Sequence, residues 1–391
     1  MKTRKNIGDI QNCYGCGVCA AACPKDIISI KLNSNGFYEP VLNKKDCVHC
    51  GLCMDVCSFS HSSVSLSESR VMGSWAAWSN DPATREKCSS GGFGFEVAKM
   101  LLSQGYSAVG CKYEMSQHRA VHFIANSLDE YLPSMGSKYI QSYTKDAFRL
   151  INYNKRYLIT GTPCQIDSFR RLIKKKGVED NFVLLDFFCH GVPSMNVWKA
   201  YVEYIESFVG PLINVSWRNK KCNGWHDSLT MGFIGTNPIK AASLLEQGDD
   251  GVLYSRMTRG DLFYRLFLGE FCSGPHCVHN CKYKFDSSAA DIRIGDLWGD
   301  TYIDNEQGVS AVVAFTEKGA KVISQMNTVT LMNHPFDVVA EGQLKQNCHQ
   351  KELSSLIQFF LKKRVPLDGF IIRVILLSQR VITKIKRVFQ I

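Results

Sequence analysis

The chain has 391 residues, of which 45% are hydrophobic and 21% charged, so it is long enough for two or three domains and too apolar to be disordered throughout. Its net charge of +10 is uneven, because the last 41 residues hold nine Lys or Arg and only two acidic residues, a net +7. Seventeen cysteines without a preceding secretory signal favour a reducing cytoplasm, and no window of about 18 apolar residues predicts a spanning helix.

The first 60 residues contain two cysteine runs of the form C-x2-C-x2-C-x3-C. This is the spacing of bacterial two-cluster ferredoxins, in which the fourth cysteine of each run ligates the other cluster. We therefore assign one [4Fe-4S] cluster to Cys13, Cys16, Cys19 and Cys57, and the other to Cys47, Cys50, Cys53 and Cys23. The alternatives are zinc knuckles, which use pairs of CxxC, and a disulfide knot, which needs an oxidising compartment.

The residues around these cysteines fit an α+β ferredoxin-like 2[4Fe-4S] module at 1–60. Pro24 follows Cys23 as in ferredoxins, whereas Ser58 stands where the second proline would be. The Asn- and Gly-containing segment 33–36 predicts a turn between two short strands. Residues 61–70 are rich in serine and predict a linker.

Residues 71–335 predict an α/β body in which strands alternate with helices. Strands are expected at 75–78, 108–114, 120–125, 156–160, 182–188, 215–218, 229–233, 291–296 and 309–316. Helices are expected at 93–102, from the loop at 161–165 to 176, through Trp198 and Tyr204, at 261–268 and at 317–326. Parallel sheets of this kind bind ligands in the loops at the carboxyl ends of their strands.

A glycine-rich turn opens the first helix of this body. Ser89, Ser90, Gly91 and Gly92 precede the apolar periodic stretch that begins at Phe93. A helix that begins this way can bind a phosphate through free N–H groups, although Ser and Gly are also ordinary N-cap residues.

A second group of cysteines lies in polar loops of the body. Cys164 and Cys189 each follow a predicted parallel strand, and Cys277 and Cys281 form a C-x3-C pair. They could hold a third [4Fe-4S] cluster or form a redox pair near a flavin. The alternative is a buried structural cysteine, which is the interpretation for Cys88, Cys111, Cys222 and Cys348.

Taken together, seven stretches resemble the beta subunit of coenzyme F420-reducing hydrogenase and related F420-linked dehydrogenase subunits, a scaffold shared with chlorophyll-type reductases. They are the doubled ferredoxin motif and residues 89–92, 136–142, 161–165, 189–193, 277–282 and 294–299. The resemblance covers roughly residues 10–330. It departs from the hydrogenase members in two ways: those work in complexes of several subunits, and the basic C-terminal segment has no counterpart.

The resemblance implies a flavin-binding body that holds FAD and exchanges electrons with iron–sulfur clusters. It implies FAD contacts from three loops, at Ser90, Gly91, Gly92, Lys138, Tyr139, Gln141, Thr160, Gly161, Thr162 and Gln165. Lys138 is also a candidate catalytic residue near the flavin or its phosphates, and His190 is the candidate proton donor because its ordinary pKa is near neutral.

The expected function is that of an iron–sulfur flavoprotein oxidoreductase. Its organic partner would be an F420-like coenzyme or a biosynthetic substrate, for example in polysaccharide synthesis, and its electron partner a ferredoxin or another redox protein. The alternative is an electron-transfer subunit without a substrate site of its own. A nucleic-acid binder is disfavoured, because the basic tail lacks interleaved aromatic residues.

The tail, 336–391, predicts a C-terminal amphipathic helix at 371–389. Arg373, Arg380, Lys384 and Arg387 share one face. The apolar residues of the other face are Ile371, Val374, Ile375, Ile382, Ile385 and Phe389. Such a helix either contacts the inner face of a membrane or packs on the body or a partner chain.

Overall fold

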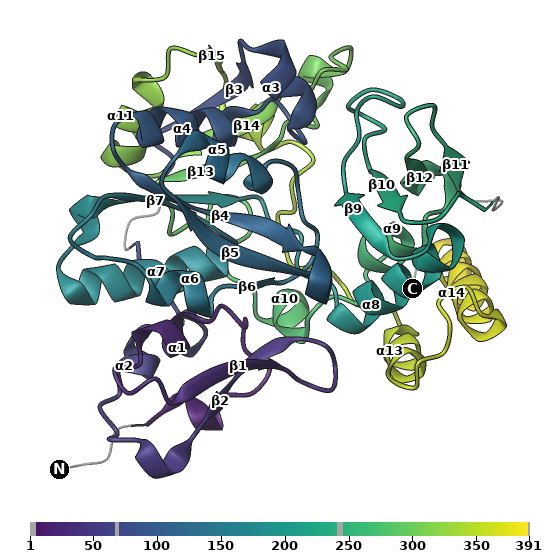
Figure 1. Ribbon diagram of the computed structural model, residues 1–391, viewed down its shortest axis with the longest axis horizontal. Coiled ribbons are helices and arrows are strands. Elements are labelled where there is room, and N and C mark those ends of the chain that lie inside the picture. The colour runs from purple at the N-terminus through teal and green to yellow at the C-terminus, as the bar shows by residue number, and fades with distance from the viewer. Residues whose placement is uncertain (1–4, 67–69, 241–244, 390–391) are drawn as a thin grey trace.

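The computed structural model describes residues 5–66, 70–240 and 245–389. Figure 1 shows the cysteine-rich N-terminal region at the lower left, below a large sheet, with a smaller sheet to the right and the two terminal helices at the right-hand edge. No helix in these described ranges combines the length and apolar character needed to cross a membrane.

The N-terminal region combines a hairpin with two short helices that carry cysteines. Strands β1 (Ile28–Leu32) and β2 (Tyr38–Leu42) pair antiparallel. The predicted turn between them is confirmed, and the Asn33 side chain accepts from the backbone N–H groups of Asn35 and Phe37. Helices α1 (Val18–Ala22) and α2 (Leu52–Asp55) each begin after a glycine with positive φ, +74° at Gly17 and +80° at Gly51.

A nine-stranded sheet forms the centre of the molecule, in the order β15-β3-β14-β13-β8-β7-β4-β5-β6. Its strands are β3 (Gly73–Ser79), β4 (Ser107–Glu114), β5 (Arg119–Ala125), β6 (Ser142–Tyr143), β7 (Tyr157–Thr160), β8 (Phe182–Phe187), β13 (Ile292–Asp296), β14 (Ser310–Ala314) and β15 (Val329–Asn333). The four central strands β4, β7, β8 and β13 run parallel, which confirms the α/β expectation. The strands that flank these four, β14 and β5, pair antiparallel with β13 and β4, and the edge strand β6 is parallel to β5. A short connection such as the one from β4 to β5 cannot return a strand in parallel.

Helices cover both faces of this sheet. They are α3 (Pro82–Lys87), α4 (Phe93–Ser103), α5 (Leu128–Tyr131), α6 (Lys145–Arg149), α7 (Pro163–Lys176), α11 (Glu317–Ser324) and α12 (Phe336–Val339). Successive strand residues point to opposite faces, so Leu158 lies in the α4 core and Ile159 in the α7 core. Val18 and Val56 of the N-terminal region join the α7 core, so this region shares hydrophobic packing with the body.

The smaller sheet has the order β11-β12-β10-β9 and is antiparallel. Its strands are β9 (Leu212–Ser216), β10 (Thr230–Gly235), β11 (Glu246–Gln247) and β12 (Leu253–Arg256). It packs on α8 (Met195–Val209) and α9 (Leu262–Phe267) around Trp198 and Trp217. Short α10 (Pro275–His279) follows, and single 3-10 turns occur at Ile7–Asp9, Lys44–Asp46, Ser58–Ser60, Met115–Gln117, Leu132–Ser134, Glu179–Asn181, Met257–Arg259 and Asp300–Tyr302.

The chain ends in α13 (Ser354–Lys362) and α14 (Phe370–Phe389). The helix expected at 371–389 is therefore present. The buried side of α14 is formed by Ile372, Ile375, Leu376 and Gln379, and its three apolar residues join the core of the smaller sheet. The apolar residues of α14 are thus divided between a packed side and an exposed side.

Candidate functional site

Four N-terminal cysteines surround one cavity next to the body. Cys13, Cys16, Cys19 and Cys57 line it together with Tyr14 and Phe59. Burial raises the pKa of the Cys13 thiol to about 12 and that of Cys16 to about 11, so the protonated form dominates unless a cation replaces the proton. We call this group the inner cysteine set.

The other four cysteines line a second cavity, toward the solvent. Cys23, Cys47, Cys50 and Cys53 line it, together with Pro24 and Val48. Cys50 is exposed, whereas Cys23 and Cys53 are buried. The structure thus groups the eight cysteines as the ferredoxin spacing predicts, and we call this second group the outer cysteine set.

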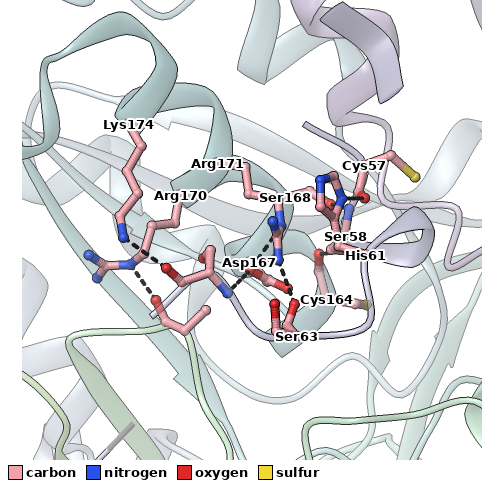
Figure 2. Close-up of polar contacts among 12 residues, drawn as sticks. Cys57, Ser58, His61, Ser63, Cys164, Asp167, Ser168, Arg170, Arg171 and Lys174 are labelled. Carbon is pink, nitrogen blue, oxygen red and sulfur yellow. Dashed lines mark hydrogen bonds and ion pairs between the residues drawn. The ribbon is translucent and has the colours of Figure 1, made fainter. Parts of the chain in front are cut away.

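The inner cysteine set is joined to the body through α7 (Figure 2). The Cys16 thiol donates to Ser168 Oγ at 3.3 Å, and the Ser58 N–H donates to the same oxygen at 3.1 Å. Figure 2 shows Cys57 and Ser58 beside Ser168. The Ser58 hydroxyl donates to the backbone carbonyl of Cys164 at 3.2 Å. The turn of α7 from Cys164 to Ser168 therefore contacts the inner cysteine set and itself carries a cysteine of the second predicted group.

The segment that follows Ser58 runs alongside α7 and is bonded to its side chains. Asp167 Oδ1 accepts from the Ser65 N–H at 2.8 Å, and Arg171 and Lys174 donate to the carbonyls of Ser63 and Ser65. Figure 2 shows several of these contacts on one side of α7. The described part of the predicted linker is thus held along α7 by hydrogen bonds.

The four cysteines of the body lie close to one another. β7 and β8 are neighbouring parallel strands, so the loops that follow them bring Cys164 and Cys189 to one edge of the sheet. Cys277 lies on α10 and Cys281 just after it; a Cβ at Gly191 would lie 3.6 Å from Cys277 Sγ, and the Gly191 N–H approaches Cys189 Sγ at 3.4 Å. Burial first, and then the neighbouring thiolates, raise the pKa values of Cys164, Cys189 and Cys277. We call these four the body cysteine set.

Tyr14 lies between the inner and body cysteine sets. It is next to Cys13 in the sequence, and its hydroxyl donates to the Asn280 carbonyl at 2.7 Å, beside Cys281. Burial raises the Tyr14 pKa, and the nearby Cys164, Cys281 and Cys277 raise it further. The two cysteine sets are therefore adjacent across a tyrosine ring and the start of α7.

Two predicted cofactor loops meet at the edge of the sheet near β3. Ser137 donates through its N–H and its hydroxyl to Ser89 Oγ, at 2.8 and 2.9 Å. Gly91 packs so tightly that a Cβ would lie 2.3 Å from the Ala77 carbonyl oxygen, and Gly92 caps α4 at φ +87°. The Ser90 hydroxyl donates to the Val309 carbonyl. The glycines are required here by close backbone approach and by the left-handed conformation.

The Lys138 ammonium is held by its own loop. It donates to the carbonyls of Pro133, Met135 and Gly136 at 2.9, 2.8 and 3.1 Å. Burial lowers the pKa of Lys138 to about 8. The three carbonyl partners oppose this lowering, because hydrogen bonds to carbonyl oxygens favour the charged ammonium. Lys138 is therefore positioned as a fixed cation of the loop, and catalysis would have to displace these contacts.

The other predicted loops lie nearer the inner cysteine set. Gln141 accepts from the Tyr38 N–H and donates to the Tyr14 carbonyl, so its amide joins the N-terminal region to the body. Gln165 accepts from the Thr162 N–H and closes the N-terminal turn of α7, and Thr160 donates to the Val109 carbonyl. These side chains have structural partners, and the N–H groups of Gly161 and Thr162 are also engaged, by the Leu185 carbonyl and by Gln165 Oε1.

His190 lies just beyond β8, next to Cys189. Burial, and then the Lys284 ammonium, lower its pKa, so the imidazole is neutral at pH 7. A neutral ring can accept a proton or donate a hydrogen bond, whereas a lowered pKa makes it a poor store of a proton to give away.

Three charged residues of this edge were missed by the sequence analysis. Arg218 is buried and bonds Tyr139 Oη at 3.1 Å and Asp296 Oδ2 at 2.9 Å, and Asp296 ends β13. Lys220 donates to the carbonyls of Arg85, Ser90 and Gln307. The signal available in the sequence was the basic loop after a predicted strand, and only the fold shows that this loop reaches the glycine-rich turn.

Comparisons with known proteins agree with this arrangement. Residues 12–60 match the model of a 4Fe-4S dicluster domain. Residues 154–334 match the model for the C-terminal part of the beta subunit of coenzyme F420 hydrogenase/dehydrogenase. The chain is thus an iron–sulfur protein of the electron-transfer class. Residues 154–334 are thus similar to the F420 hydrogenase/dehydrogenase beta-subunit family, and a dicluster domain precedes them at 12–60, which confirms the resemblance drawn from the motifs.

Among solved structures, the chain is similar to one from the F420-reducing [NiFe] hydrogenase complex of Methanosarcina barkeri, described as a xenon derivative. The two share 16% identity and a TM-score of 0.47, over 82% of this chain and 94% of the other. A similarity at this level does not by itself establish a shared fold. No curated protein matches the chain.

Proposed function

We propose that the chain is an iron–sulfur flavoprotein oxidoreductase that moves electrons between two [4Fe-4S] clusters, FAD and an organic acceptor or donor. The observation that carries this proposal is the contact of Cys16 and Ser58 with Ser168, one turn along α7 from Cys164. It brings the inner cysteine set against the loops at the carboxyl edge of a parallel sheet, where ligands bind in α/β proteins.

The cysteine sets fit iron–sulfur clusters by their chemistry. Each N-terminal set offers four thiols around a cavity, and we assign one [4Fe-4S] cluster to each. We assign a third to Cys164, Cys189, Cys277 and Cys281. In the described residues no three His, Cys, Asp or Glu side chains converge tightly enough for a single metal ion. The thiolates around one zinc ion each lie about 2.3 Å from the same metal and are therefore close to one another. The thiolates of a cubane bind four different irons and therefore lie further apart.

The edge from β3 to β13 fits FAD. Backbone at Ser90, Gly91 and Gly92 opens α4, an 11-residue helix, and Lys138, Lys220 and Arg218 supply cations beside it. Bound there, a flavin supplies the ability to take electrons singly and transfer them in pairs. The chain's own residues would hold its phosphates and, through Tyr139 with Arg218, orient it.

His190 is our candidate for the residue that handles a proton at the substrate. It follows β8 directly and lies near Asp296, which ends the neighbouring β13. Because its ring is neutral at pH 7, we assign it the role of hydrogen-bond donor or proton acceptor. The substrate would be an F420-like coenzyme or a biosynthetic intermediate such as a sugar of polysaccharide synthesis.

Anaerobic purification followed by iron, sulfide and flavin analysis tests these assignments. We expect about twelve irons and one FAD per chain, or about eight irons if the body cysteine set holds no cluster. Iron without FAD would overturn the flavoprotein proposal.

The second candidate function is an electron-transfer subunit that serves a partner enzyme, and kinship with a subunit family favours it. In either case, the exposed Cys50 side of the outer cysteine set is where we place a ferredoxin or another redox protein, in the cytoplasm. Turnover of a small molecule by the isolated chain would favour the first function. Activity that needs an added partner would favour the second.

A further inference from the structure

The outward side of α14 carries an apolar stripe that nothing in the described chain covers. Exposed apolar side chains recur along it at Phe370, Val374, Leu377, Val381 and Ile385, with exposed fractions of 82% at Phe370 and 58% at Val381. Ile372, Ile375 and Leu376, on the opposite side, pack on the body. Steps of three and four residues put the exposed members on one helical face.

This stripe is the densest exposed apolar surface among the described residues. Of the 19 large hydrophobic residues that are exposed there, eight lie on or beside the two terminal helices, with Leu356 and Phe359 of α13 and Ile371 adding to the five of the stripe. Single exposed hydrophobic residues are ordinary, whereas a row along one helix marks an interaction surface.

The charges beside the stripe indicate what covers it. α14 contains five basic residues and no acidic one. Arg373, Arg380 and Lys384 are exposed and fall between the packed side and the apolar stripe. Lys386 is paired with Glu352 at 2.5 Å, which helps fix the helix on the body. Such a row of cations matches an anionic surface along one edge of the apolar stripe.

We propose that α14 docks on an anionic lipid surface, with the Phe370–Ile385 stripe inserted at the headgroup boundary and Arg373, Arg380 and Lys384 against the headgroups. Long basic side chains at the edge of an apolar face suit this geometry, because their stems stay in the apolar layer while the charges reach the headgroups. A second copy of the chain fits less well, since pairing two such stripes would bring two rows of cations together.

The orientation that follows leaves the electron-transfer region accessible. α14 lies at the right-hand edge of the molecule, and the N-terminal cysteine-rich region lies at the lower left (Figure 1). A lipid surface on α14 would therefore leave the outer cysteine set open to a soluble redox partner.

Co-sedimentation of the full chain with vesicles tests this docking. We expect binding to vesicles of phosphatidylcholine mixed with phosphatidylglycerol, and much weaker binding to phosphatidylcholine alone. Arg380→Gln with Lys384→Gln should weaken binding to the mixed vesicles about 25-fold, because each cation near an anionic surface contributes about fivefold. Val381→Glu with Ile385→Glu should abolish it.

The matched control is Leu132→Glu with Met332→Glu, which adds the same charge at exposed apolar positions outside the tail. It should bind the mixed vesicles as the unaltered chain does, apart from the small effect of net charge. All variants should keep the helical content and iron of the unaltered chain. The proposal is wrong if the unaltered chain does not bind the mixed vesicles, or if the Val381 and Ile385 variant binds as well as the control. Dimers that only this variant disrupts, without vesicle binding, would assign the stripe to a second copy.

Discussion

The N-terminal and the body cysteine sets bring thiols together in different ways. The eight N-terminal cysteines lie within 45 residues, from Cys13 to Cys57, and short turns with glycines at positive φ bring them around two cavities. The four body cysteines run from Cys164 to Cys281 and converge only because β7 and β8 are neighbours and α10 packs beside their ends. The first arrangement is local in sequence, whereas the second depends on the tertiary fold.

The largest expected effect comes from removing one ligand from each set. Cys16→Ala and Cys164→Ala should each lower the iron content by about four per chain, because a cubane rarely survives the loss of a thiolate. Cys272→Ala is the matched control, since Cys272 is buried, five residues before Cys277, and belongs to neither set. Iron analysis with electron paramagnetic resonance of the reduced protein reads out each cluster. Unchanged iron in Cys164→Ala would remove the third cluster and leave the body cysteines as structural thiols.

A buried ion pair near the body cysteine set can be used to test whether the two cysteine arrangements differ in stability. Asp186 accepts from Arg293 through two bonds of 2.7 Å, both side chains are fully buried, and Arg293 also donates to the carbonyls of Tyr283 and Phe285, just after Cys281. Asp186→Ala would leave a buried guanidinium without its carboxylate, so the free energy of unfolding should fall by about 3–5 kcal/mol.

Denaturant titration, followed by iron release and far-UV circular dichroism, measures this. We expect the body set to lose iron first in Asp186→Ala, while the dicluster region keeps its clusters. Asp9→Ala is the control, because the Asp9–Lys44 pair is exposed and should contribute less than about 1 kcal/mol. Simultaneous loss of all clusters would show that the two regions unfold as one unit.

The same contrast explains what the sequence could predict. The ferredoxin spacing predicted both N-terminal groupings, because short-range spacing alone fixes them. The parallel order of β7 and β8 followed from the alternation of strands and helices, and with it the proximity of Cys164 and Cys189. The ion pair of Arg218 and Asp296, and the use of Gln141 to hold Tyr14 and Tyr38, could not be predicted, since each partner lies 78 or more residues away.

A buried histidine beside β7, the strand that precedes Cys164, should make the stability of the fold sensitive to acid. His122 donates through Nε2 to the Thr160 carbonyl at 3.0 Å, and burial lowers its pKa from 6.5 to about 4. Between these values the unfolded chain binds a proton that the folded chain does not, so stability falls as the pH drops from 6.5 to 4, by at most about 3 kcal/mol.

His122→Gln should flatten this part of the profile, because an amide does not titrate. The measurement is the difference in unfolding free energy between the two proteins at each pH, in which acid loss of the clusters cancels. A difference that stays constant from pH 6.5 to 4 would show that His122 is not the titrating group.

The smallest expected effect tests the contact of Ser58, in the N-terminal region, with α7 of the body. Ser58→Pro would restore the residue of the ferredoxin pattern, but proline has no N–H to donate to Ser168 and no hydroxyl to donate to the Cys164 carbonyl. We expect both N-terminal clusters to assemble, and the free energy of unfolding to fall by about 1–2 kcal/mol.

Ser58→Ala removes the hydroxyl alone, so the difference between the two variants isolates the amide. Ser60→Ala is the local control, because the Ser60 hydroxyl contacts the carbonyls of Met54 and Cys57 and the His61 ring but not α7. If Ser58→Pro were as stable as the unaltered chain, the serine would be a neutral replacement, and the dicluster region would dock on α7 through its apolar contacts at Val18 and Val56.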